Sequence, residues 1–196
     1  MFSLDKKMID LLLEETLPSY QATCKESNNL GFGFLYYSMV RALRPSKTIV
    51  IGSKAGFSVT CFGLGIKDNE GHTIANVNCY DTPLTFPTEK AKLHFIDPSF
   101  SYDRGDENHW YGIGHWDSKE KVDQQWKKYE IHGIVEHFKV TSKEYLKSNQ
   151  VLNGVDLLYI DGDHSYEGIT HDFNAFYDIL KKDAIVIAHD VDPALA

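Results

Sequence analysis

The first part of the chain has apolar side chains at helical spacing. They recur over residues 8–13, and Pro18 ends that segment. A second apolar helix is predicted over residues 30–43, because Pro45 disfavours a helical residue before it. We expect these helices to form an N-terminal unit over residues 1–45.

The rest of the chain alternates short apolar runs with helical patterns. Strands are predicted at residues 48–51, 93–96, 134–140, 155–160 and 184–188, and helices at residues 58–66, 119–129, 143–148 and 166–180. Strands that alternate with helices form mostly parallel sheets, because a parallel connection needs a long crossover. We therefore predict an α/β fold, a doubly wound Rossmann-like sheet over residues 46–196, in a single domain that spans residues 1–196.

Two stretches interrupt this alternation. Residues 67–92 are rich in turn-forming residues, with at most a short strand at 73–77, and we interpret them as an insertion. Residues 99–117 combine aromatic side chains, glycine and charge, which is typical of a surface loop that could close over a substrate. The alternative for Trp116 is an ordinary packing anchor.

Composition narrows the class of protein. The chain has 196 residues, with 28 acidic against 20 basic residues and a formal charge of −8, and its lysines are scattered. Nucleic-acid binding needs clustered positive charge, so we expect a small-molecule substrate and no nucleic-acid partner. The sequence leaves open whether the chain forms a homo-oligomer.

Cysteine usage and hydropathy indicate a compartment. The three cysteines show no CxxC spacing, which argues against a disulfide framework and a cysteine zinc site. No apolar run reaches the length of a membrane span, and acidic residues interrupt any signal-peptide core near the start. We expect a cytoplasmic protein without a membrane partner.

A glycine turn follows the first predicted strand. Gly52 and Gly56 allow the backbone to approach a ligand closely, Ser53 lies between them, and Ser58 lies near a helix N-terminus, where free N–H groups favour an anionic group. A packing turn explains the same glycines equally well.

Asp97 directly follows the second predicted strand, where a carboxylate can accept both hydroxyls of a ribose. Its alternative interpretation is a turn-forming residue before Pro98. The gap from Gly52 to Asp97 is long, so Asp81 is a second candidate for the ribose ligand.

The richest cluster is the segment 161–167, DGDHSYE, which follows the fourth strand. Two carboxylates and an imidazole at one strand end are costly to hold together unless something positive balances them. Asp163 or Ser165 can cap the next helix, but capping needs neither Asp161 nor His164. His189 and Asp190 follow the fifth strand and would lie beside Asp161 if the two strands are neighbours.

Together these segments resemble class I S-adenosylmethionine-dependent methyltransferases, in particular a metal-dependent O-methyltransferase-like group with DGDHSYEG after the fourth strand and HD after the fifth. The similarity runs from about Phe32 to Asp190, and its most specific parts are IVIGSKAGFS, LHFIDPSF, DLLYIDGDHSYEG and VIAHD. These motifs are far more specific in combination than a lone glycine turn.

The resemblance implies particular roles. The residues that match cofactor-binding positions are Gly52, Ser53, Gly56 and Ser58 around the methionine moiety, Asp97 at the ribose, and Ser142 and Lys143 at the adenine. Asp161, His189 and Asp190 match positions that ligate a divalent cation, Mg²⁺ or another ion, and His164 matches a catalytic base. The implied reaction is methylation of a small-molecule or sugar hydroxyl, with Asp161 and His164 as catalytic residues.

Two departures from the pattern keep alternatives open. Val50 stands where many relatives have an acidic residue, and the sequence ends at Ala196, before two further strands and a substrate-covering segment that the fold usually adds. The fifth strand is then expected to be a sheet edge. The alternatives are a cofactor-binding domain without transferase activity and a metal-dependent hydrolase. A nicotinamide-dependent dehydrogenase fits less well because the turn lacks GxGxxG.

Overall fold

The computed structural model describes residues 3–15, 20–70, 90–99, 116 and 118–189. The helices are α1 Lys6–Glu15, α2 Phe32–Leu43, α3 Phe57–Glu70, α4 Lys119–Lys128, α5 Ser142–Tyr145 and α6 Tyr166–Phe176, with short 3₁₀ turns η1 Tyr20–Ala22 and η2 Tyr177–Ile179. The strands are β1 Lys47–Ile51, β2 Lys92–Ile96, β3 Val135–Phe138, β4 Val155–Ile160 and β5 Leu180–Ala188. The predicted alternation of strand and helix is confirmed.

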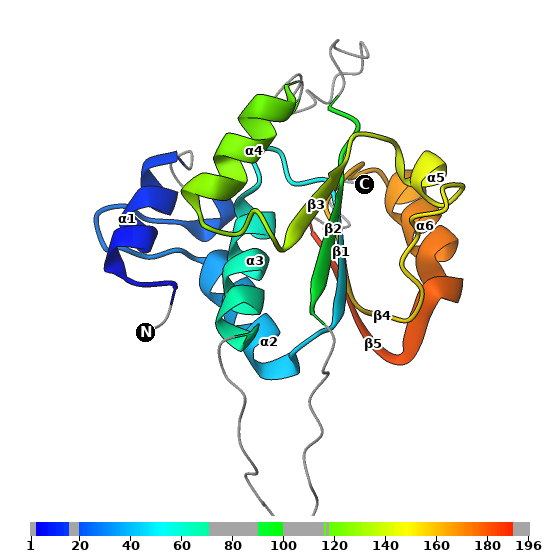
Figure 1. Ribbon diagram of the computed structural model, residues 1–196, viewed down its shortest axis with the longest axis horizontal. Helices are drawn as coiled ribbons and strands as arrows, with labels where there is room; N and C mark the ends of the chain where they lie inside the picture. Colours follow the sequence, from blue (N-terminus) through cyan, green and yellow to red (C-terminus); the bar gives the residue numbers. More distant parts are fainter. Residues whose placement is uncertain (1–2, 16–19, 71–89, 100–115, 117, 190–196) are drawn as a thin grey trace, which may run out of the picture.

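The five strands form one sheet in the order β3-β2-β1-β4-β5, and all of its pairings are parallel. The sheet lies between two layers of helices: α1 to α4 on one side, and α5 and α6 on the other (Figure 1). The chain order starts at the centre of the sheet, moves outward to β3, and then returns across β1 to β4. This reversal between β1 and β4 is the switch point at which doubly wound sheets bind ligands.

Side chains on successive strand residues point to opposite faces, so each strand supplies both cores. Val50 and Tyr159 belong to the core beneath α1 to α4, whereas Ile49, Leu158 and Ile160 belong to the core beneath α5 and α6. Because β1 and β4 are buried on both faces, their sequences are nearly continuous apolar runs.

Helix α3 is longer than the sequence pattern indicated. It continues to Glu70, so residues 67–70 belong to the helix and not to the expected insertion. Its polar last turn is held by tertiary hydrogen bonds: the Tyr37 hydroxyl donates to Asp68, and Arg41 donates to Asn69. Such partners are distant in sequence, which is why periodicity ended the helix too early.

Other boundaries moved less. Strand β5 begins at Leu180 rather than 184, and the predicted helix 166–180 ends at Phe176 and continues as η2. The predicted strand at 73–77, Asp81 and Asp190 lie outside the described residues. Within the described part of the chain, no helix combines the length and apolar content that a membrane span requires.

Most of the expected surface loop 99–117 also lies outside the described residues, but Trp116 does not. Its side chain is buried against Phe95 and Trp126, and its indole N–H donates to the Lys54 carbonyl (2.9 Å). Trp116 is therefore a packing anchor that supports the glycine turn.

Candidate functional site

The backbone brings the predicted polar residues to one edge of the sheet. The amide that follows each of four strands donates to the last residue of a neighbouring strand: Gly52 to Ile96 (2.9 Å), Asp97 to Phe138 (3.1 Å), Asp161 to Ile51 (2.8 Å) and His189 to Ile160 (2.9 Å). The sheet ladder thus extends by one residue into the loops. The backbone of the first residue of each loop is therefore held by a hydrogen bond to a neighbouring strand.

The glycine turn packs closely against the end of β4. Gly52 has φ +69°, and a Cβ there would lie 2.3 Å from the Asp161 carbonyl oxygen, so only glycine fits. Gly56 has φ +82° and would meet Trp116 in the same way. Packing therefore accounts for both glycines. A role for these two glycines in cofactor binding is a separate proposal.

Two serines line the inside of this turn. Ser53 and Ser58 are both buried, and their hydroxyl oxygens lie 2.5 Å apart. Ser58 is the second residue of α3, so it does not cap the helix with its side chain. The Ser53 amide also donates to the Asp97 carboxylate.

Asp97 lies between the glycine turn and β3. Its carboxylate accepts from the backbone amide of Ser99 (2.7 Å), and His137 lies 3.1 Å from its carbonyl oxygen. Burial raises the pKa of Asp97 to about 6; the amides of Ser99 and Ser53 oppose that rise, and the charge of Asp161 adds to it. Asp97 can thus form the turn before Pro98 and still have a carboxylate that accepts hydrogen bonds from ligand hydroxyls.

Asp161 is the centre of a compact polar cluster. Its side chain is 6% exposed, and its Oδ1 lies 3.2 Å from His164 Nε2 and 3.1 Å from His189 Nδ1. Burial would raise its pKa, but hydrogen bonds and charge from the two histidines outweigh burial and hold the pKa below its usual value. The expected neighbourhood of Asp161, His164 and His189 is confirmed, whereas Asp190 lies outside the described residues.

The other residues of the DGDHSYEG motif shape the loop. Ser165 is the N-cap of α6 and accepts from the Gly168 amide (3.0 Å), while Asp163 accepts from the Ser165 amide (2.9 Å). A Cβ at Gly168 would lie 2.4 Å from the Asp163 carboxyl carbon, so glycine is required there. Ser165 is therefore the residue that caps α6, and Asp163 forms the turn that precedes it.

Ser142 and Lys143 lie at the start of α5. The N-cap is Thr141, which forms a capping box with Glu144. The Ser142 hydroxyl donates to Asp172 on α6 (2.7 Å), and Lys143 is exposed. Asp172 is buried, and its Oδ2 lies 3.8 Å from the Cβ position of Gly162, which links this pair to the Asp161 loop.

Sequence reasoning missed Tyr159, Tyr36 and Asp172 as supporting residues. The Tyr159 hydroxyl donates to Asp161 Oδ2 (3.3 Å) and contacts the Tyr36 hydroxyl on α2 (2.9 Å). One signal was available: Tyr159 is the polar-tipped residue in the apolar run before Asp161, two positions away and hence on the same side of the strand. Nothing in the sequence pointed to Tyr36 or Asp172.

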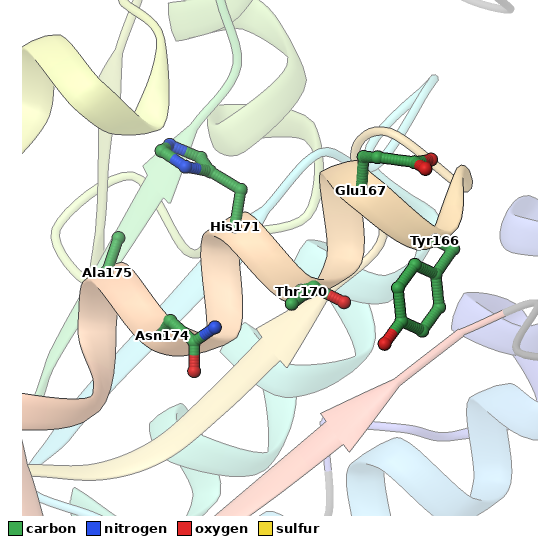
Figure 2. Close-up of a pocket in the computed structure, with 6 residues that line it drawn as sticks. All are labelled: Tyr166, Glu167, Thr170, His171, Asn174 and Ala175. Atoms are coloured by element: carbon green, nitrogen blue, oxygen red, sulfur yellow. The ribbon is translucent and has the colours of Figure 1, made fainter.

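A hollow of about 530 Å³ lies along α6 and begins at the last residues of the motif. Figure 2 shows its lining residues along the helix, from Tyr166 in the first turn to Ala175. Tyr166 is 70% exposed, which leaves an aromatic face available near His164.

The sheet order, with its turn and carboxylates at the carboxyl ends of the strands, defines a Rossmann-like α/β domain. Residues 49–191 match the family model described as a methyltransferase domain. The chain therefore belongs to the methyltransferase domain family. A 67-residue stretch is 36% identical to the uncharacterized protein R132 of Acanthamoeba polyphaga mimivirus and covers 32% of this chain and 30% of that protein.

Several solved structures share the fold. The chain is similar to a putative O-methyltransferase from Klebsiella pneumoniae (TM-score 0.55, 12% identity, 93% of this chain and 63% of that one). It is also similar to the O-methyltransferase TomG from Streptomyces achromogenes in complex with SAM (0.54, 13%, 93% and 63%). The O-methyltransferase from Bacillus cereus in complex with SAH is similar as well, with a TM-score of 0.55 and 11% identity over 93% of this chain and 64% of that one. The chain thus spans less than two thirds of the length of these structures.

Proposed function

We propose that the protein is an S-adenosylmethionine-dependent O-methyltransferase that acts on a hydroxyl group of a small molecule or sugar, with help from a divalent cation. The observation that carries the proposal is the convergence of the glycine turn, Asp97 and the Asp161 cluster at one edge of the sheet. Membership of the methyltransferase domain family supports it, as do structural neighbours determined with SAM or SAH.

In this proposal the cofactor lies across the carboxyl ends of β1, β2 and β3. The amides of the glycine turn, with Ser53 and Ser58, hold the methionine part. The Asp97 carboxylate accepts the ribose hydroxyls, because its two oxygens can accept more bonds than the Ser99 and Ser53 amides donate. Ser142 and Lys143 flank the adenine, and Asp172 orients the Ser142 hydroxyl.

The acceptor hydroxyl is activated at the Asp161 cluster. In methyl transfer the acceptor oxygen forms a bond to the methyl carbon while the carbon–sulfur bond breaks, and the hydroxyl proton must leave. The simplest assignment gives the proton to His164, whose side chain is 45% exposed, while Asp161, His189 and Asp190 hold the cation. A divalent cation there would lower the pKa of the acceptor hydroxyl.

The proposal is tested by isothermal titration with S-adenosylmethionine, followed by measurement of S-adenosylhomocysteine released with sugars and phenols as acceptors. We expect binding by the wild-type chain and loss of binding in Asp97→Ala. Asp123→Asn, an exposed carboxylate on α4, is the matched control and should bind normally. Absence of cofactor binding contradicts the proposal.

Two other outcomes would identify the alternatives. Cofactor binding without methyl transfer to any acceptor favours a binding domain that lacks transferase activity. Cation-dependent hydrolysis without cofactor affinity favours a hydrolase, which gives no role to Asp97 or the glycine turn.

A further inference from the structure

We propose that Asp161, His164 and His189 together bind one transition-metal ion, such as Zn²⁺ or Fe²⁺, in preference to Mg²⁺. This inference rests on the proposed function and changes the set of residues that ligate the cation. His164 becomes a ligand of the cation instead of a free base.

The spacing of the donor atoms suits a single ion. Ligands about 2.1 Å from one ion, at angles between 90° and 109°, lie about 3.0 to 3.4 Å from each other. Asp161 Oδ1 lies 3.2 Å from His164 Nε2 and 3.1 Å from His189 Nδ1. All three donor atoms lie within 4.8 Å of one another. Small side-chain movements therefore suffice to place one ion among them.

The chemistry of the donor atoms favours a transition metal. Two imidazole nitrogens and one carboxylate oxygen suit zinc and the later first-row transition metals, whereas Mg²⁺ prefers an all-oxygen shell with several waters. His164 and His189 both disfavour Mg²⁺, because each places a nitrogen where that ion prefers an oxygen. Three protein ligands leave coordination positions open for water or an acceptor hydroxyl.

The backbone and neighbouring side chains hold the three donors in place. The amides of Asp161 and His189 donate to the ends of neighbouring strands, and the Ser165 cap fixes the loop that carries His164. Tyr159 donates to Asp161 Oδ2, so Oδ1 is the oxygen that faces the two imidazoles. Hydrogen bonds of this kind orient metal ligands in known sites.

The cluster is also accessible. The His164 side chain is 45% exposed, whereas His189 and Asp161 are 16% and 6% exposed. An ion can therefore enter from the side of His164 and settle against the two more buried ligands. With both imidazoles engaged, the acceptor proton leaves to water.

The experiment titrates Co²⁺ into the metal-depleted chain of residues 1–196 and follows visible absorption and calorimetry. We expect a saturable spectrum of a nitrogen-ligated ion, displacement by Zn²⁺, and no displacement by millimolar Mg²⁺. His164→Gln, His189→Gln and Asp161→Asn should each weaken Co²⁺ binding at least tenfold. His171→Gln, an exposed histidine of α6 labelled in Figure 2, is the matched control and should bind like the wild type.

Three results would overturn the inference: no Co²⁺ binding, equal competition by Mg²⁺, or unchanged binding in His164→Gln. X-ray absorption of the wild-type Zn²⁺ protein gives the number of imidazole ligands without relying on any variant. Two imidazoles are expected, and one or none contradicts the site.

Titration with S-adenosylmethionine on the same samples separates the two proposals. Cofactor binding without a Co²⁺ site contradicts this inference alone, and a Co²⁺ site without cofactor binding contradicts the proposed transferase activity.

Discussion

The hydroxyl groups of Tyr36 and Tyr159 lie 2.9 Å apart in the buried core. Tyr36 is on α2, in the N-terminal unit, and Tyr159 is on β4, two residues before Asp161. Because Tyr159 also reaches Asp161 Oδ2, the N-terminal helices are connected to the polar cluster by hydrogen bonds. Those helices therefore support the site as well as covering the sheet.

The chain of hydroxyls continues to Gln21, whose side chain lies 2.7 Å from the Tyr36 hydroxyl. Gln21 is buried and has a left-handed backbone, φ +54°, packed under Gly31. The Tyr36 hydroxyl donates to the Gln21 side-chain oxygen Oε1.

Replacing Tyr159 by Phe should therefore loosen Asp161. We expect about a tenfold loss of cation affinity, in line with other residues that orient metal ligands, and a loss of about 1 to 2 kcal/mol in the free energy of unfolding, because the Tyr36 hydroxyl loses a partner. Calorimetry and chemical denaturation measure the two effects. Tyr145→Phe is the matched control: Tyr145 is equally buried and hydrogen-bonded to His94, but it lies in the other core. Equal cation affinity in both variants would contradict the positioning role.

Cofactor affinity should depend on the protonation of Asp97. Its pKa is about 6, so below that pH the carboxyl is protonated and loses an acceptor for the ribose hydroxyls. We expect the dissociation constant for S-adenosylmethionine to rise as pH falls from 7 to 5. A profile that stays flat over this range would remove Asp97 from the cofactor site.

The same carboxyl should lower the stability of the free protein at neutral pH. A carboxyl whose folded pKa exceeds its unfolded value contributes stability that is complete below about pH 4 and is lost as pH rises through 6. Asp97→Asn should therefore be more stable than the wild type at pH 7 by roughly 1 to 2 kcal/mol, after the loss of one accepted hydrogen bond. The difference should vanish near pH 4. Thermal denaturation at both pH values checks it.

Gly52→Ala tests the contact between the glycine turn and the end of β4. The new Cβ would meet the Asp161 carbonyl oxygen at 2.3 Å, so the backbone must shift. We expect a loss of more than about 2 kcal/mol of stability, together with weaker cofactor and cation binding. Gly154→Ala has the same left-handed strain, φ +70°, but faces only the Lys181 side chain at 3.7 Å. If both variants lose equal stability, strain alone explains the glycine.

Ser165→Ala removes the cap of the helix that follows His164. We expect a loss of about 1 kcal/mol of stability, the usual cost of an N-cap, and a few-fold loss of cation affinity because the loop carrying His164 is released. Ser118→Ala removes the cap of α4, which lies away from the cluster, and should lower stability without changing cation affinity. Denaturation curves and Co²⁺ titration together separate helix stability from ligand positioning.

The sequence by itself determined the order of elements and the residues at the strand ends. Apolar runs such as 155–160 are buried on both faces of the sheet, so their hydrophobicity is visible without the fold. Because parallel strands end at a common edge, Gly52, Asp97, Asp161 and His189 could be assigned to one site from their positions alone. The cap formed by Ser165 follows from local geometry, and it was one of two candidates.

Only the tertiary structure decided the contacts between distant segments. The last turn of α3 depends on Tyr37 and Arg41, Asp161 is oriented through Tyr159 by Tyr36, and Ser142 pairs with Asp172. Each pairing joins side chains from different elements, and its energy exists only once packing has removed water from both partners. Local patterns carry no record of such contacts, which is why the donors of the cluster were predictable whereas Tyr36 and Asp172 were not.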